Sequence, residues 1–211
     1  IINEVEGVSL VTKAGEPISY FGFKTNGIFT NNDEASQYTG PNGKQGTAGD
    51  IRYIDVDGNK VINDIDKMII GCPIAPIYGG LYASVAVGNV EFKADFAFST
   101  GNDIYSHVNK LGQSMQLGQN QQAIVKKRWN STNTGSDFPA LSIGDEYGNN
   151  VFSDRWIEDG SYVRMRSFTV SYKYPKSTKI FDNLTLYLTA SNLVTLTSYS
   201  GLDPEFMLYN D

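Results

Sequence analysis

Residues 81–98 read Leu-Tyr-Ala-Ser-Val-Ala-Val-Gly-Asn-Val-Glu-Phe-Lys-Ala-Asp-Phe-Ala-Phe. Apolar side chains occupy every second position as far as Val87, and the alternation resumes at Val90 after the turn pair Gly88-Asn89. Successive side chains of a strand point to opposite faces, so Phe92, Phe96 and Phe98 share a face and Glu91, Lys93 and Asp95 share the other. The pattern predicts an antiparallel hairpin with an apolar medium on one face only.

The same two-residue period appears in the second half of the chain. A long strand is predicted from about Asp154 to Tyr174, and its phase changes near Arg166-Ser167, which indicates a bulge. Another strand is predicted over 183–192, where Leu184, Leu186 and Leu188 alternate with Thr and Tyr. Together with Phe92, Phe96 and Phe98, these leucines are expected on an outer apolar surface, whereas Glu91, Lys93 and Asp95 are expected to face an interior. Arg164 and Arg166 share one parity and are expected to point together into a wet interior.

The segments between these strands differ in character. Short strands are predicted over 5–13 and 18–24, and polar loops over 25–50 and 129–152. Residues 103–127 predict a helical insert, because Ile104, Val108, Leu111 and Met115 recur at helical spacing after a possible N-cap, Asp103. The fold class predicted is therefore all-β, with long loops on one side and one helical insert. Long loops on one side of antiparallel strands are typical of an outer-membrane β-barrel.

Composition excludes several classes of function. The net charge is −6 and no basic patch dominates, so nucleic acid is not an expected partner. Cys72 and His107 are the only residues of their kinds, which excludes an intramolecular disulfide and argues against a Ser-His-Asp triad. The sequence contains no run of roughly 18 apolar residues, so no transmembrane helix is predicted. The chain opens at Ile1 without a start Met and is interpreted as a piece of something longer.

Residues 51–71 contain an acidic motif, Asp-Val-Asp-Gly-Asn-Lys-Val-Ile-Asn-Asp-Ile-Asp over 55–66. Counted as a 12-residue EF-hand-like calcium loop, it offers the side chains of Asp55, Asp57, Asn59 and Asp66 and the backbone carbonyl of Val61. Lys60 stands where Gly usually makes the sharp turn, and Asp66 stands where a longer Glu usually closes the shell. The sequence predicts a structural Ca²⁺ site here, and the alternative is a solvated acidic turn.

Several stretches resemble the C-terminal third of SusC/RagA-type TonB-dependent transporters of Bacteroidetes. Two of them are specific: the run Asp-Arg-Trp-Ile-Glu-Asp-Gly-Ser-Tyr over 154–162, and Asn192-Leu193 followed by Gly201-Leu202-Asp203-Pro204-Glu205. Further stretches with the same resemblance are 17–29, 48–55, 69–71, 78–80 and 101–104. The match extends over almost the whole chain, so residues 1–211 are interpreted as a C-terminal fragment of such a receptor's β-barrel.

The resemblance implies a role in the outer membrane. Such receptors form a plugged barrel of roughly 22 strands that imports large nutrients. TonB supplies the energy through an N-terminal region, and a SusD-like lipoprotein covers the barrel as a lid. The substrates implied are oligosaccharides or peptides, the barrel would contact outer-membrane lipid, and no enzyme activity is expected.

Two alternatives of other classes share the same sequence features. A soluble calcium-stabilised β-sandwich, acting as a carbohydrate-binding module, would also show alternating strands and a calcium loop. It would bury its apolar faces against a second sheet instead of exposing them. Asp154, Glu158 and Asp159 offer the paired carboxylates that a glycosidase requires, although nothing in the sequence sets their separation.

Overall fold

The computed structural model describes residues 1–5, 7–115, 120–176 and 181–205. The chain divides into two compact units, each made of two segments that are distant in sequence. Unit 1 consists of Ile1–Ile74 and Ile104–Glu158, and unit 2 of Ala75–Asp103 and Asp159–Asp211. Among the described residues, no helix is long and apolar enough to cross a membrane.

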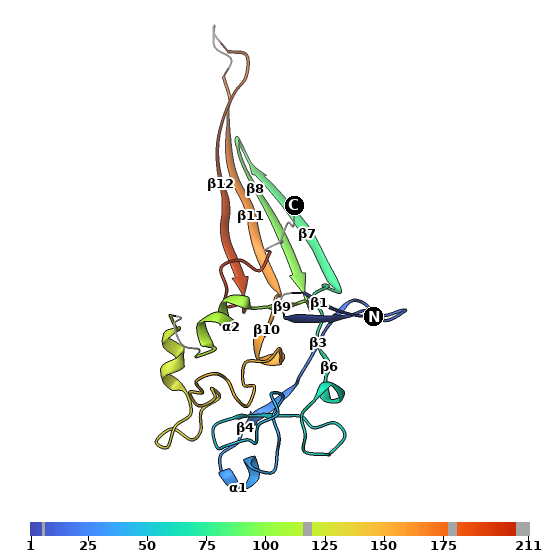
Figure 1. Ribbon diagram of the computed structural model, residues 1–211. Helices are drawn as coiled ribbons and strands as arrows, with labels where there is room; N and C mark the ends of the chain where they lie inside the picture. Colours follow the sequence, from blue (N-terminus) through green and yellow to red (C-terminus); the bar gives the residue numbers. More distant parts are fainter. Residues whose placement is uncertain (6, 116–119, 177–180, 206–211) are drawn as a thin grey trace. The chain divides into compact units, whose positions relative to one another are not determined.

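Unit 2 is built on a four-stranded antiparallel sheet of long strands (Figure 1). Its strands are β7 (Ile77–Val87), β8 (Val90–Thr100), β11 (Tyr162–Tyr174) and β12 (Leu184–Thr197), and they lie in the order β12-β11-β8-β7. Val87 pairs with Val90 across a two-residue turn, and Gly88 has a φ of 61°, which glycine adopts without steric cost. The hairpin predicted at this turn is therefore confirmed.

The predicted bulge is also confirmed. The pairing of β11 with both neighbouring strands shifts register between Met165 and Ser167, so Arg166 is the irregular residue. On β12, Asn192 has a φ of 53°, a left-handed conformation that Asn tolerates better than most residues. Across this point the register with β11 shifts and the pairing resumes at Val194, so β12 extends to Thr197 instead of ending near 192.

The register gives the sheet of unit 2 two chemically distinct faces, because residues paired across antiparallel strands lie on the same side. We call them the apolar face and the polar face. The apolar face carries Leu81, Ala83, Val85, Val87, Val90, Phe92, Ala94, Phe96, Phe98, Val163, Met165, Phe168, Val170, Tyr172, Leu186, Leu188, Ala190, Val194 and Leu196. The polar face carries Tyr82, Ser84, Glu91, Lys93, Asp95, Tyr162, Arg164, Ser167, Thr169, Ser171, Tyr187, Thr189, Ser191 and Thr195.

Much of the apolar face is open. Leu81, Val85, Leu186, Leu188 and Leu196 are between 58% and 76% exposed. In the part of the chain that the structure describes, this face therefore does not pack against a second sheet. The β-sandwich alternative is wrong for this sheet, since a sandwich would bury these side chains.

Unit 1 is built from short elements. From its first segment come β1 (Ile2–Val5), β2 (Val8–Val11), β3 (Ser19–Gly22), β4 (Thr25–Ile28), α1 (Asn32–Ala35), β5 (Ile51–Tyr53), the 3-10 turn η1 (Asp64–Asp66) and β6 (Met68–Gly71). The strands form one sheet in the order β1-β2-β3-β6 and a second from β4 and β5. The stretch 25–50, predicted as a loop, thus contains a short strand and a one-turn helix. Asn31 caps that helix by accepting a hydrogen bond from the Glu34 amide.

A single aromatic core joins the two segments of unit 1. Six of its buried residues come from the first segment, and Tyr147 comes from the second. The Tyr53 and Tyr147 rings stack with centroids 6.5 Å apart, and Phe29 meets Tyr147 edge-on. The remaining core residues are Phe23, Ala35, Ile51 and Ile62. Because Tyr147 lies in a stretch predicted as a polar loop, only the folded chain shows that the loop contributes to a core.

The predicted helical insert at 103–127 is present, but its helix is shorter and starts later. β9 (Asp103–Tyr105) pairs with β10 (Ile157–Asp159), so Asp103 is a strand residue and not an N-cap. The helix α2 covers His107–Gln113, and a 3-10 turn, η2, covers Ala123–Lys127. The part of the prediction over 116–119 lies outside the described residues. Pairing of β9 with a strand some 50 residues away explains the difference, because local periodicity carries no information about it.

Candidate functional site

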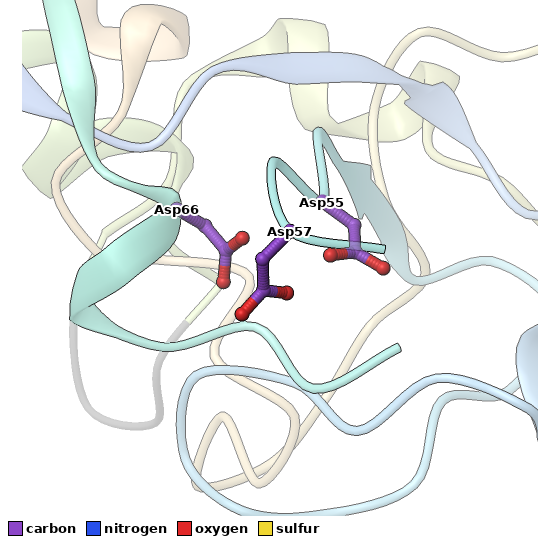
Figure 2. A group of neighbouring side chains, drawn as sticks. All are labelled: Asp55, Asp57 and Asp66. Atoms are coloured by element: carbon purple, nitrogen blue, oxygen red, sulfur yellow. The ribbon is translucent and has the colours of Figure 1, made fainter. Parts of the chain in front are cut away.

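The acidic motif places three carboxylates at one point. Asp55 follows β5, Asp57 lies two residues further along, and Asp66 closes the 3-10 turn η1. One carboxylate oxygen from each lies within 4.8 Å of the others. Figure 2 shows the three side chains converging from opposite sides of the loop. The spacing read from the sequence therefore brings Asp55, Asp57 and Asp66 together as predicted.

Backbone amides shape the first half of this loop. The Asp55 carboxylate accepts hydrogen bonds from the Gly58 and Lys60 amides, each at 2.8 Å. Lys60 has a φ of 64°, so it adopts the left-handed conformation for which glycine is usual at this position. Desolvation raises the pKa of Asp55, but the hydrogen bonds from the backbone amides of Lys60, Gly58 and Asn59 outweigh it, and the net pKa lies below its usual value. The carboxylate is thus held ionised, as a cation ligand must be.

The other two predicted ligands are occupied within the loop. The Asn59 amide oxygen accepts from the Val61 amide at 2.6 Å, and the Asn59 amide nitrogen donates to Asp57 at 2.8 Å. The Val61 carbonyl accepts from the Asn63 side chain at 3.0 Å. A calcium shell that used these oxygens would have to exchange these bonds for coordination. The same holds for the carboxylates of Asp55, Asp57 and Asp66, which also accept hydrogen bonds from within the loop.

Asp66 and Ile62 are the buried residues of the loop. Asp66 is fully buried and accepts hydrogen bonds from the Val56 and Asn63 amides, each at 2.8 Å. Ile62, 2% exposed, belongs to the aromatic core, and its amide donates to the Thr39 carbonyl at 2.9 Å. Occupancy of the carboxylate cluster would therefore act directly on the stability of unit 1.

A buried polar network, which sequence reasoning missed, links the two segments of unit 1. The Asn149 side chain donates to Asp50 and accepts from the Ile51 amide, each at 2.8 Å. Asp145 accepts from the amides of Asn149 and Asn150 at 2.6 and 2.9 Å. A run of Asp and Asn in a loop is a recognisable signal for local backbone bonds, as Asp145 makes here. The pairing with Asp50, 99 residues away, leaves no local signal.

The run Asp154-Arg155-Trp156 also makes structural contacts within unit 1. Asp154 accepts a hydrogen bond from the Thr25 amide at 2.9 Å. The Arg155 guanidinium lies 4.4 Å from the ring centre of Trp156, and Trp156 is fully buried with its indole nitrogen donating to Val151. Burial lowers the pKa of Arg155 to about 10, which leaves the group charged at neutral pH. Of the other two acids considered for catalysis, Glu158 accepts from Asn109 and Asp159 from the Ser161 amide.

Arg164 on the polar face and Arg166 at the bulge reach the same acidic residue, Glu205, so the two side chains lie on one side of the sheet. Arg164 pairs with Asp203 and, at 3.0 Å, with Glu205. Arg166 pairs with the same Glu205 at 2.5 Å. The sequence marked the arginines and the Gly-x-Asp-Pro-Glu run separately. Only the folded chain shows that the acids of that run are the partners of these arginines.

An exposed apolar face opposite a polar face, on long antiparallel strands, defines a segment of a membrane β-barrel. Comparison with known proteins agrees. The chain is 27% identical over 208 residues to the TonB-dependent receptor P3 of Formosa agariphila. The alignment covers 95% of this chain and 20% of that receptor. It is 25% identical over 159 residues to the TonB-dependent receptor SusC of Bacteroides thetaiotaomicron, covering 72% of this chain and 15% of SusC.

Solved structures show the same fold. The RagAB peptide transporter matches with a TM-score of 0.74 at 20% identity, over 94% of this chain and 21% of that chain. RagAB in its closed-closed state matches with a TM-score of 0.73 at 21% identity, over 96% of this chain and 22% of that chain. No profile of a known protein family matches.

These similarities confirm the resemblance to SusC/RagA-type TonB-dependent receptors and the prediction of an antiparallel barrel segment with a helical insert. TonB-dependent receptors are outer-membrane proteins, which supports the predicted location. The chain spans about a fifth or less of the length of the curated relatives it matches.

Proposed function

We propose that the chain is a segment of an outer-membrane importer that takes up oligosaccharides or peptides with energy from TonB. The two-faced sheet of unit 2 carries the proposal. A sheet of four long strands whose apolar side chains remain exposed requires an apolar surrounding, and the bilayer supplies one. The opposite face, rich in Ser, Thr, Tyr and charged side chains, would line a water-filled interior.

The relatives indicate the kind of transport. They are TonB-dependent receptors and a peptide importer, and none is described as an enzyme. A SusD-like lipoprotein is the partner proposed at the outer opening, and TonB is the proposed source of energy. The long loops of the chain are the segments proposed to face that partner, because the outer loops of such barrels are the long ones.

The orientation of the sheet can be tested with two neighbouring residues of β12. Leu186 lies on the apolar face and Tyr187 on the polar face, and both are well exposed. In the intact receptor, in bilayers, a fluorophore on Leu186→Cys should be quenched by a lipid-borne quencher, and one on Tyr187→Cys by aqueous iodide. The reverse result, or aqueous quenching of both, would reject the barrel-wall assignment.

The transport role requires a genetic test. Deletion of the gene for the intact receptor should abolish growth of the parent bacterium on at least one oligosaccharide or peptide as sole nutrient. Co-purification of a lipoprotein with the tagged receptor would support the proposed lid. If growth on every polymeric nutrient were unchanged, the transport role would be wrong, while the fold would stand.

We further propose that Asp55, Asp57 and Asp66 bind one structural Ca²⁺, with Asn59 and the Val61 carbonyl as the additional ligands. The convergence of three carboxylates supports this, because Ca²⁺ takes six to eight oxygen ligands in a flexible shell. Titration of chelator-treated protein with calcium should release or absorb heat, and Asp57→Asn should remove the effect. Asp64→Asn is the matched control, since Asp64 lies in the same loop but pairs with Lys67. Absence of calcium-dependent heat at millimolar concentration would reject the site.

A further inference from the structure

The chain that follows β12 returns onto the polar face of unit 2. We define residues 198–205 as the strap. At its start, the Ser198 hydroxyl donates to Asp159 at 3.2 Å. At its other end, Asp203 and Glu205 reach the arginines of β11. The strap thus covers the first residues of β11 and is attached at both ends.

The attachment at the second end is a four-membered ion-pair cluster. Arg164 contacts both acids, Arg166 contacts Glu205, and the Glu205 amide donates to the Asp203 carboxylate at 2.8 Å. The Nε atom of Arg164 also donates to the Thr195 hydroxyl at 3.1 Å, so the guanidinium is oriented from β12 as well. Charge-assisted bonds of this kind are stronger than neutral ones and fix direction.

Burial is restricted to the centre of this cluster. The Arg164 side chain is 11% exposed, and Pro204, between the two acids, is buried. The neighbouring Arg166 side chain is 50% exposed, and Leu202 of the strap is fully exposed. The Arg164 guanidinium lowers the pKa of Asp203, and the Glu205 amide acts in the same direction. The strap is therefore held mainly by charges and buries few apolar side chains.

We propose that residues 198–205 are a strap that an arginine clasp, Arg164 and Arg166, holds closed over the polar face at the start of β11. Placing this face inside the barrel rests on the proposed function, and there the strap would narrow the water-filled interior. Because the clasp is electrostatic and partly open to water, the strap opens locally when the ion pairs are broken, without unfolding of the sheet.

Hydrogen exchange of the intact receptor in detergent micelles measures this opening directly. In Arg164→Gln, the Glu205 amide should exchange at least about tenfold faster, since its acceptor Asp203 loses its main anchor. Raising the salt from about 0.1 M to about 1 M, which shortens the Debye length from about 10 Å to about 3 Å, should accelerate exchange in the unchanged protein. The amides of β8 should keep their rates in both experiments.

Lys93→Gln is the matched control. Lys93 lies on the same polar face and pairs with Glu91 at 3.0 Å, away from the strap. Loss of the Lys93 charge should leave the exchange rate of the Glu205 amide unchanged. Should Arg164→Gln fail to fold, Asp203→Asn tests the same clasp without altering β11. The proposal would be overturned if the Glu205 amide exchanged at the same rate in the unchanged protein and in the clasp variants, and at both salt concentrations. Because no transport is measured, this outcome is independent of the test of import.

Discussion

Replacement of Leu188 by Arg tests the apolar face of unit 2 at a defined place. Leu188 lies on β12, is 76% exposed, and is paired with Val170 of β11. Val170 is paired with Phe92 of β8, which is paired with Val85 of β7. The side chain thus belongs to an apolar row that crosses all four strands. If the face contacts lipid, an arginine in this row places a cation in hydrocarbon.

The expected cost depends on depth in the bilayer. A lipid-facing arginine costs about 2–4 kcal/mol at the midplane of an outer-membrane barrel and about 0–1 kcal/mol near its interfaces. Apolar rows lie on both sides of Leu188, through Leu186 and Ala190 on the same strand. The row of Leu186 adjoins the Gly88-Asn89 turn, so the row of Leu188 is expected between that end of the strands and the midplane. We therefore expect Leu188→Arg to lower the free energy of unfolding by about 1–3 kcal/mol, between the interface and midplane values.

Thr189→Arg is the matched control, because Thr189 is the next residue and lies on the polar face. Its hydroxyl lies 2.9 Å from that of Thr169, so the variant loses one neutral hydrogen bond, about 0.5–1.5 kcal/mol. Unfolding of the intact receptor by denaturant in lipid vesicles measures both variants. Equal costs, or a larger cost for Thr189→Arg, would refute the assignment of the two faces.

Three further predictions concern unit 1 and the chain as a whole. Asn149→Ala should lower the free energy of unfolding of unit 1 by about 1–3 kcal/mol, because the Ile51 amide loses its acceptor and the buried Asp50 carboxylate keeps only its hydrogen bonds from Thr47; unchanged proteolytic resistance of unit 1 would contradict this. Lys60→Gly should stabilise the acidic loop by about 0.5–1 kcal/mol, because glycine adopts the left-handed conformation at no steric cost, and calcium titration with thermal melting can detect it. The isolated 211-residue chain should aggregate or need detergent, since β7 and β12 are open edges beside an exposed apolar face; a monodisperse, detergent-free monomer in size-exclusion chromatography would argue against the barrel.

Local sequence pattern was sufficient for the features that depend on neighbours in the chain. The hairpin through Gly88-Asn89, the two faces of its strands and the bulge at Arg166 all follow from the alternation of side chains along an extended backbone. The convergence of Asp55, Asp57 and Asp66 followed equally from spacing, because all three lie within one short loop. Such features involve few residues, so their geometry is determined within the segment that carries the signal.

Only the tertiary structure decided which distant segments meet. The sequence showed a polar loop around Tyr147 and Asn149, but not that Tyr147 enters an aromatic core or that Asn149 binds Asp50. Likewise, it showed arginines on β11 and acids after β12, but not that Arg164 closes on Asp203. These contacts join residues 39 to 99 positions apart, where periodicity carries no information and burial of the whole chain selects the partner. The two-faced strands were thus determined by the sequence alone, whereas the joined core of unit 1 and the clasp on the strap required the complete fold.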